Sequence, residues 1–152
     1  MIRRKNFKKR NTTPDPIYNS ILLQMVINQL TKKGKKHLAF KLINQTLQQI
    51  EQKTQEDPLQ ILEKGILNVT PIFEIKSKRI GGSVYPTPVE LIPERGNSIG
   101  IRWILNACRG KSGKRLIVKL TNEFIESSKK MGSAMRKKNE IQKIAESNAR
   151  VL

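Results

Sequence analysis

The chain has 152 residues and a formal net charge of +18, because 30 Lys and Arg stand against 12 Asp and Glu. Such a charge repels itself unless a polyanion neutralises it, so nucleic acid or an anionic membrane surface is the expected partner. The sequence excludes a membrane-spanning helix and a secretory signal, and its single cysteine, Cys108, excludes an intrachain disulfide. Separate clusters of cations and an aromatic content of only 5% argue against the membrane surface.

The first 14 residues form a strongly basic stretch. They hold six Lys or Arg and no Asp or Glu, with too little apolar surface to order themselves. We interpret residues 1–14 as a basic N-terminal arm that becomes ordered on binding. A transit peptide is the alternative, and the density of cations favours the arm. Residues 15–152 are expected to form a single helical domain.

Apolar residues recur at helical spacing in three segments of the N-terminal half, 21–30, 36–52 and 58–68. The turn signal Asp15-Pro16 precedes the first segment, and Gly34 ends it. Asp57-Pro58 opens the third, because Asp is a favoured N-cap and Pro suits the first helical turn. The first two segments predict apolar faces made of Ile21, Leu22, Met25, Val26, Leu30, Leu38, Ala39, Leu42, Ile43, Leu47 and Ile50.

A β-hairpin is predicted at about 72–91. Two β-like stretches flank Gly81-Gly82, and this glycine pair permits the tight reversal that a hairpin needs. Pro86 and Pro88 cannot donate ladder hydrogen bonds. They therefore suit an edge strand or an incompletely paired arm that projects from a helical body.

The C-terminal half predicts three more helices, from Pro93 or Ser98 to Cys108, over 116–125, and from Ala134 to about Ala149. The first is apolar around much of its circumference and should be the central helix, with Trp103 in the core. The last has few apolar residues among many cations, so it should be peripheral. The predicted fold is mainly α, a bundle of about six helices with a protruding β-hairpin and a basic disordered N-terminal arm.

Residue types that carry catalysis or bind metals are scarce. His37 is the only histidine and Cys108 the only thiol, so no Cys/His metal set or nucleophilic triad is available. The loop CRGKSGKRL, residues 108–116, lacks the spacing of a phosphate-binding P-loop. We interpret the acids of the C-terminal half as solvated charges or ion-pair partners on polar faces, namely Glu94, Glu123, Glu126, Glu140 and Glu146. We therefore expect no enzyme, no catalytic residue, no metal site and no cofactor.

Clusters of cations carry the functional argument, and they lie at 3–10, 32–36, 76–79, 95–102 and 109–115. Each alone is explained by a solvated helix end or turn, but a folded bundle can bring them together on one face for a polyphosphate. Structured RNA fits best, because proteins recognise it by shape and backbone. Double-stranded DNA is the alternative, weakened because the cationic helix predicted at 134–149 has no evident helix-turn-helix partner or zipper.

The hairpin turn combines three features of a nucleic-acid contact. Glycines without side chains let the backbone approach phosphate and sugar, nearby cations supply charge, and Tyr85 can stack on a base or sugar. An exposed turn whose charges only discourage edge-to-edge aggregation is the alternative.

Several motifs resemble the small-subunit ribosomal protein seven family of bacteria and organelles. They are GKK at 34–36, KTQEDPLQ at 53–60, EIKSKRIGGSVYPTPVELIPER at 74–95, IRWI at 101–104 and IAESN at 144–148. The resemblance implies six helices with a protruding hairpin, bound to the 3′ major domain of small-subunit rRNA, where the protein nucleates assembly of the subunit head. It also implies a hairpin near the exit-site tRNA and the mRNA exit path, with head and platform ribosomal proteins as neighbours.

By position, the resemblance implies RNA contacts from Arg3, Arg4, Lys9, Arg10, Lys35, Lys36, Lys76, Lys78, Arg79, Arg95, Arg102 and Lys114. Family members commonly have Arg at the positions of Lys76 and Lys78, so the charge is kept here but the planar fork is lost. They often have Gln where Pro86 stands. The richness in Lys, Ile and Asn, together with a family-like start, predicts a plastid (chloroplast) ribosome, with a bacterial cytoplasm as the alternative.

Overall fold

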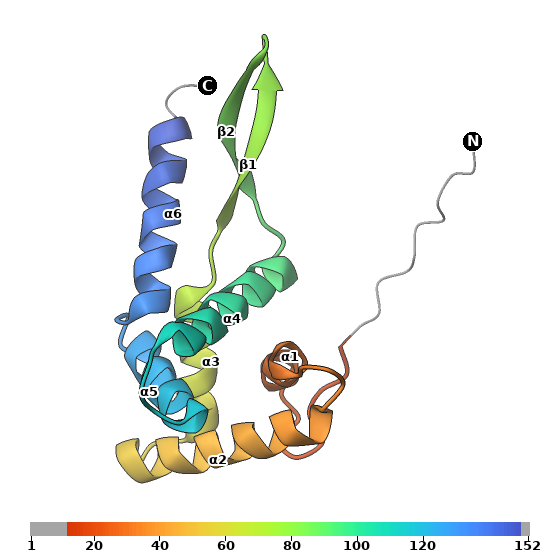
Figure 1. The fold of residues 1–152 in the computed structure, drawn as a ribbon, viewed down its shortest axis with the longest axis vertical. Coiled ribbons are helices and arrows are strands. Elements are labelled where there is room, and N and C mark those ends of the chain that lie inside the picture. The colour runs from red at the N-terminus through yellow and green to blue at the C-terminus, as the bar shows by residue number, and fades with distance from the viewer. Residues whose placement is uncertain (1–11, 150–152) are drawn as a thin grey trace, which may run out of the picture.

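The structure is a computed structural model that describes residues 12–149. The secondary structure of this part of the chain consists of helices and one antiparallel hairpin (Figure 1). In chain order the elements are α1 (Ile21–Leu30), α2 (Lys36–Thr54), α3 (Pro58–Val69), β1 (Phe73–Ile80), β2 (Ser83–Glu90), α4 (Pro93–Gly110), α5 (Leu116–Ser128) and α6 (Ser133–Ala149). This confirms the mainly helical fold with one hairpin. The predicted basic arm falls on residues 1–14, most of which lie outside the described range.

The local signals at helix starts act largely as predicted. Asp57 caps α3, because its Oδ1 accepts a hydrogen bond from the Leu59 N–H at 3.0 Å. Asp15 instead closes a turn, where its Oδ2 accepts from the N–H groups of Ile17 and Tyr18, both at 3.1 Å. The cap of α1 is Ser20, whose side chain accepts from the N–H of the third helical residue.

Helix α4, predicted to be central, contacts α1, α3, α5 and α6, but α3 contacts all five other helices and is the more central of the two. Trp103 is 9% exposed and belongs to the buried core, as predicted. Two of the predicted apolar positions are exposed, Ile21 at 54% and Leu38 at 51%, whereas Leu22, Met25 and Leu42 are partly buried against the core.

The hairpin pairs in register from Phe73 opposite Glu90 to Ile80 opposite Ser83. Gly81 and Gly82 both have positive φ, +57° and +90°, as a tight two-residue hairpin turn requires. Pro86 and Pro88 lie two residues apart, so their missing N–H groups occupy the same side of the strand. A two-stranded ribbon leaves every second N–H without a ladder partner, and both prolines are therefore tolerated.

Glycines on α4 bring the chain that leaves α3 against this helix. A Cβ at Gly96 would lie 3.0 Å from the Pro71 carbonyl oxygen, and one at Gly100 would lie 3.2 Å from Thr70 Cα. These contacts are too close for a larger side chain unless the backbone moves. The base of the hairpin is therefore held tightly against α4.

Helix α6 runs beside the hairpin and contacts both of its strands (Figure 1). Between them lies only a shallow depression of about 30 Å³, lined by Pro71, Ile72, Phe73, Lys138, Ile141 and Gln142. The helix is peripheral, as predicted, since most of its side chains are exposed. The arm nevertheless does not project alone, because α6 supports its lower part and only the tip extends beyond the helix.

Cys108 provides a chemical test of the core. Burial, and to a smaller extent the charge of Glu123, raises the pKa of the Cys108 thiol to about 12. Because the thiolate is the reactive form, its fraction near pH 8 should fall by about three orders of magnitude relative to an ordinary thiol. We expect the native chain to resist an aromatic disulfide reagent and to release one equivalent of chromophore in denaturant. Rapid stoichiometric reaction of the native chain would contradict this packing.

Candidate nucleic-acid interface

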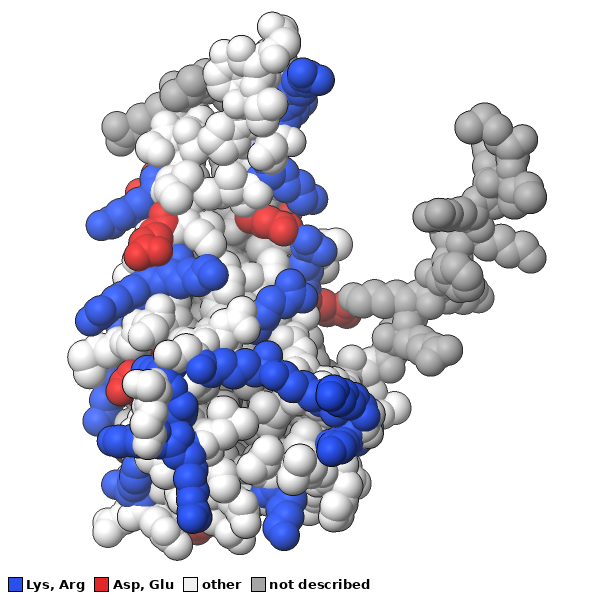
Figure 2. Space-filling view, viewed as in Figure 1, with Lys and Arg blue, Asp and Glu red and all other residues white. Residues whose placement is uncertain are grey.

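Three arginines project from one face of α4 at intervals of seven residues, Arg95, Arg102 and Arg109. Seven residues span almost two helical turns, so the three side chains stand in a row about 10 Å apart. All three are exposed. Figure 2 shows Lys and Arg side chains across the part of the surface where α4 lies and along the hairpin, with few acids among them.

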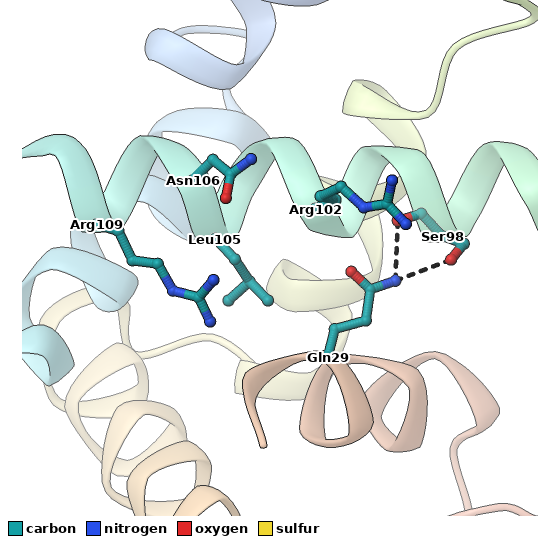
Figure 3. Close-up of a pocket in the computed structure, with 6 residues that line it drawn as sticks. All are labelled: Gln29, Ser98, Arg102, Leu105, Asn106 and Arg109. Carbon is teal, nitrogen blue, oxygen red and sulfur yellow. Dashed lines mark hydrogen bonds between the residues drawn. The ribbon is translucent and has the colours of Figure 1, made fainter. Parts of the chain in front are cut away.

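A groove of about 400 Å³ separates α1 from α4. Its lining consists of Gln29, Ser98, Arg102, Leu105, Asn106 and Arg109 (Figure 3). Gln29 Nε2 donates to both the carbonyl oxygen and the hydroxyl of Ser98 at 2.9 Å, which joins the two helices at one end of the groove. The walls thus offer two guanidinium groups and two side-chain amides over an apolar leucine, a combination suited to a sugar-phosphate with a base edge.

A second groove of about 250 Å³ adjoins the first at Arg109, which lines both. Its other charged residues are Lys32 and Lys35, from the turn between α1 and α2. Apolar residues from three helices complete it, namely Leu30, Leu38, Ala39, Leu42 and Leu116. Cations from two of the predicted clusters therefore converge here, although more than 70 residues separate them in the sequence.

Two helix N-termini next to the second groove lack acidic partners. The N-cap residues are Lys35 for α2 and Arg115 for α5, and neither makes a side-chain capping bond. No acid lies in the first turn of either helix. The positive end of each helix dipole therefore adds to the local cations instead of offsetting them. Phosphate groups would relieve this accumulation of positive charge.

The cations of the hairpin divide between its two faces. Lys76 and Lys78 lie on one face, and Tyr85, directly opposite Lys78 in the register, is on the same side. Arg79 lies on the other face, opposite Val84. All three cations are exposed, and the tyrosine is 42% exposed. The ring and two ammonium groups can therefore meet one nucleic-acid strand together, while Arg79 faces away from them.

Arg95 differs from the other two arginines of α4, because it already has a carboxylate partner. Its Nε and one terminal nitrogen each lie 2.9 Å from the carboxylate oxygens of Glu74 on β1. This bidentate pair lowers the pKa of Glu74 and joins the base of the hairpin to α4. Arg95 thus positions the hairpin as well as adding charge to the surface.

The structure leaves every described residue of the predicted site exposed, namely Lys35, Lys36, Lys76, Lys78, Arg79, Arg95, Arg102 and Lys114. Arg3, Arg4, Lys9 and Arg10 lie outside the described residues. Arg102 lines the first groove and Lys35 lines the second, and Arg109 lines both. That residue was absent from the predicted site, although its seven-residue spacing from Arg102 could have identified it.

One of the acids of the C-terminal half does not lie on a polar face. Glu123 is 0% exposed, so the expectation of a solvated charge is wrong for this residue, and its other interpretation, an ion-pair partner, is correct. It lies on the buried face of α5, between Leu120 and Phe124, and the ion pair with Lys111 makes its burial tolerable. Lys111 is consequently turned inward, and the exposed cations of its loop are Lys114 and Arg115.

Across 12–149 no group of three or more His, Cys, Asp or Glu side chains is placed to hold a metal ion. No helix in that range combines the length and apolar character that crossing a membrane requires.

Comparison with known proteins gives a consistent result along the chain. Residues 2–149 match the family described as Ribosomal protein S7p/S5e. Small ribosomal subunit protein uS7c of Prototheca wickerhamii is 49% identical over 148 residues, which is 97% of this chain and 95% of the relative. The uS7c protein of Tupiella akineta is 47% identical and uS7 of Synechocystis sp. is 41% identical, each with the same coverage.

These relatives agree with the expectations from the sequence. Algal uS7c proteins support the predicted plastid localisation, and cyanobacterial uS7 proteins are also related. A ribosomal protein of this kind is structural and not an enzyme, and its partners include ribosomal RNA and other ribosomal proteins. The chain belongs to the ribosomal protein S7p/S5e family and is a structural constituent of the small ribosomal subunit.

Proposed function

We propose that this chain is a primary binder of the 3′ major domain of small-subunit rRNA and nucleates assembly of the subunit head. The observation that carries the proposal is the meeting of two cation-lined grooves at Arg109. Together with the uncapped ends of α2 and α5, the two adjoining grooves gather cations from the α1–α2 turn, from α4 and from loop 111–115. Grooves lined by cations from separate segments suit a folded RNA, because proteins recognise RNA mainly by its shape and its sugar-phosphate backbone.

The proposed RNA contacts extend from the grooves to the hairpin. In the described part of the chain they are Lys35, Lys36, Lys76, Lys78, Arg79, Arg95, Arg102, Arg109 and Lys114. Arg3, Arg4, Lys9 and Arg10 of the basic arm are proposed to add further contacts. The hairpin would lie near the exit-site tRNA and the mRNA exit path, and neighbouring proteins of the head and platform would complete the surroundings.

The test compares two RNAs with the full chain. We expect tight binding to a 3′ major domain transcript and much weaker binding to a random-sequence duplex of the same length. If about ten phosphates are contacted, the logarithm of the affinity should fall with the logarithm of the salt concentration with a slope of about −7 to −9. Filter binding from low to high salt measures both quantities.

A second measurement places the chain in the particle. It should co-sediment with small subunits in a sucrose gradient and leave them only at high salt. Equal affinity for the transcript and the random duplex at physiological salt would contradict the proposal. A heparin-resistant footprint on duplex DNA would support the DNA-binding alternative instead.

A further inference from the structure

Glu123 is a fully buried carboxylate that joins two parts of the chain. Its Oε2 lies 2.6 Å from the Lys111 ammonium, in the connection between α4 and α5. Its Oε1 accepts a hydrogen bond from the Ala134 N–H at 3.0 Å, in the first turn of α6. A buried charge is costly unless it has such partners. Lys111 and Ala134 therefore make it possible for the Glu123 carboxylate to be buried at this point.

At the α6 end, Glu123 supplies what that helix lacks. The first turn of α6 contains no acid of its own, and a carboxylate at a helix N-terminus is stabilising. Gly132, just before the helix, has a φ of +98°, and a Cβ there would lie 3.1 Å from Glu123 Oε1. The connection from α5 to α6 is therefore shaped to bring the helix end onto this carboxylate.

At the other end, Glu123 holds the basic loop 111–115. Burial acts to lower the pKa of Lys111, but hydrogen bonding to Glu123 and Glu126 outweighs it and raises the pKa. The ammonium of Lys119 also bonds to the Lys111 carbonyl oxygen. These contacts fix the start of the loop that exposes Lys114 and Arg115 to solvent.

From α6 the connection continues to the hairpin. Helix α6 contacts both strands, as Figure 1 shows, and its Lys138 ammonium bonds to the carbonyl oxygen of Asn68 near the end of α3. Asn68 in turn donates to the carbonyl oxygens of Ser127 and Ser128 at 3.1 Å. Displacement of the start of α6 would therefore be transmitted along α6 to both strands of the hairpin and to the end of α3.

We propose that Glu123 is a positioning residue for RNA binding. It contacts no RNA, but it fixes α6 and loop 111–115 relative to each other, so that the hairpin and the loop present their cations in one arrangement. The part of this inference that concerns RNA rests on the proposed function, whereas the part that concerns geometry applies to the free protein.

The test variant is Glu123→Gln in the full chain. Glutamine has almost the same volume and keeps an oxygen for Ala134, but it loses the nearer of the two carboxylate charges that hold Lys111 and leaves only that of Glu126. Glu140→Gln is the matched control, because it makes the same chemical change at an exposed position of α6. Both variants gain one unit of positive charge, so a difference between them cannot come from net charge.

Distances in the free protein provide a readout that does not depend on RNA. Spin labels are attached at Gln48→Cys on α2 together with either Asn139→Cys on α6 or Ser83→Cys at the hairpin, all exposed positions. Cys108 is fully buried and will not take up label. We expect narrow distance distributions in the parent and in Glu140→Gln, and clearly broader ones for both label pairs in Glu123→Gln.

Binding to the 3′ major domain transcript provides the second readout, at a temperature where all variants are folded. We expect Glu123→Gln to bind about tenfold more weakly, with a salt slope shallower by about one, as for the loss of one phosphate contact. Lys111→Arg keeps a cation beside the carboxylate and should retain parental behaviour in both readouts. A defect of general packing would not spare that conservative change.

A double variant keeps the test available if Glu123→Gln does not fold. Glu123→Gln with Lys111→Met removes both charges and leaves no unpaired buried ion, and it should show the same broadening and the same weaker binding. Unchanged distance distributions, or broader distributions with parental RNA affinity, would overturn the positioning role. Failure of the parent itself to prefer the transcript would contradict the proposed function, and the distance distributions alone would then decide whether Glu123 fixes the geometry.

Discussion

Replacing Lys76, Lys78 and Arg79 together with Gln is expected to weaken binding to the 3′ major domain transcript by about 100-fold without lowering the thermal midpoint of unfolding. Each side chain is exposed on the hairpin, and each is proposed to contact phosphate. Loss of three such contacts removes roughly one unit of salt slope per residue and a charge-assisted interaction each time. Filter binding across a range of salt concentrations and thermal unfolding followed by circular dichroism measure the two effects.

The control replaces Lys64, Lys129 and Lys130 with Gln. These cations are exposed and lie outside the predicted clusters. Their replacement removes the same net charge as the hairpin variant does. We expect a much smaller loss of affinity from this triple variant. An equal loss would mean that net charge and not the hairpin governs binding. A drop of many degrees in the midpoint of the hairpin variant would mean that its cations stabilise the packing against α6.

Local sequence signals were sufficient to predict the elements of this fold. Asp57-Pro58 sets the start of α3 through an N-cap and a first-turn proline, and the observed bond to Leu59 is the one expected. Gly81-Gly82 fixes the hairpin turn because both residues need positive φ. These effects act within a few residues, so a single sequence contains them.

The relation between elements was harder to predict, because it depends on residues far apart in the chain. Charge clustering indicated that cations would converge, but not that Arg109 would join two grooves between α1, α2, α4 and α5. The support that α6 gives the hairpin was also missed. The thin apolar face of α6 offers little signal, and its partner strands lie more than 40 residues earlier in the sequence.

Glu123 shows how a general rule can conceal a signal that is present. Ionisable residues in helices are usually solvated, and that rule favours an exposed side chain. Glu123 nevertheless lies three residues after Leu120 and next to Phe124, on the stripe that helical periodicity assigns to the core. Position outweighs residue type here because Lys111 arrives from another segment to neutralise the charge.

Replacing Phe124 with Ala is expected to lower the free energy of unfolding by about 3–5 kcal/mol, which makes this variant more destabilising than the hairpin variant. Phe124 is 1% exposed on α5, and this helix packs against α3. The two helix backbones are already close, since a Cβ at Gly65 would lie only 3.1 Å from the Phe124 carbonyl oxygen. The helices therefore cannot move together to fill the cavity that the lost ring leaves, and the full cost of the cavity remains. Urea unfolding followed by circular dichroism measures the decrease.

Ile125→Ala is the matched control, because the neighbouring side chain is only half-buried and its loss should cost roughly half as much or less. At a low temperature, where Phe124→Ala remains folded, this variant should bind the transcript with nearly parental affinity and an unchanged salt slope, since no proposed RNA contact is removed. The hairpin variant should thus lose RNA affinity but keep its stability, whereas the core variant should lose stability but keep its RNA affinity. Similar losses of affinity in both, with both fully folded, would mean that RNA binding depends on the packing of the whole bundle and not on the surface cations.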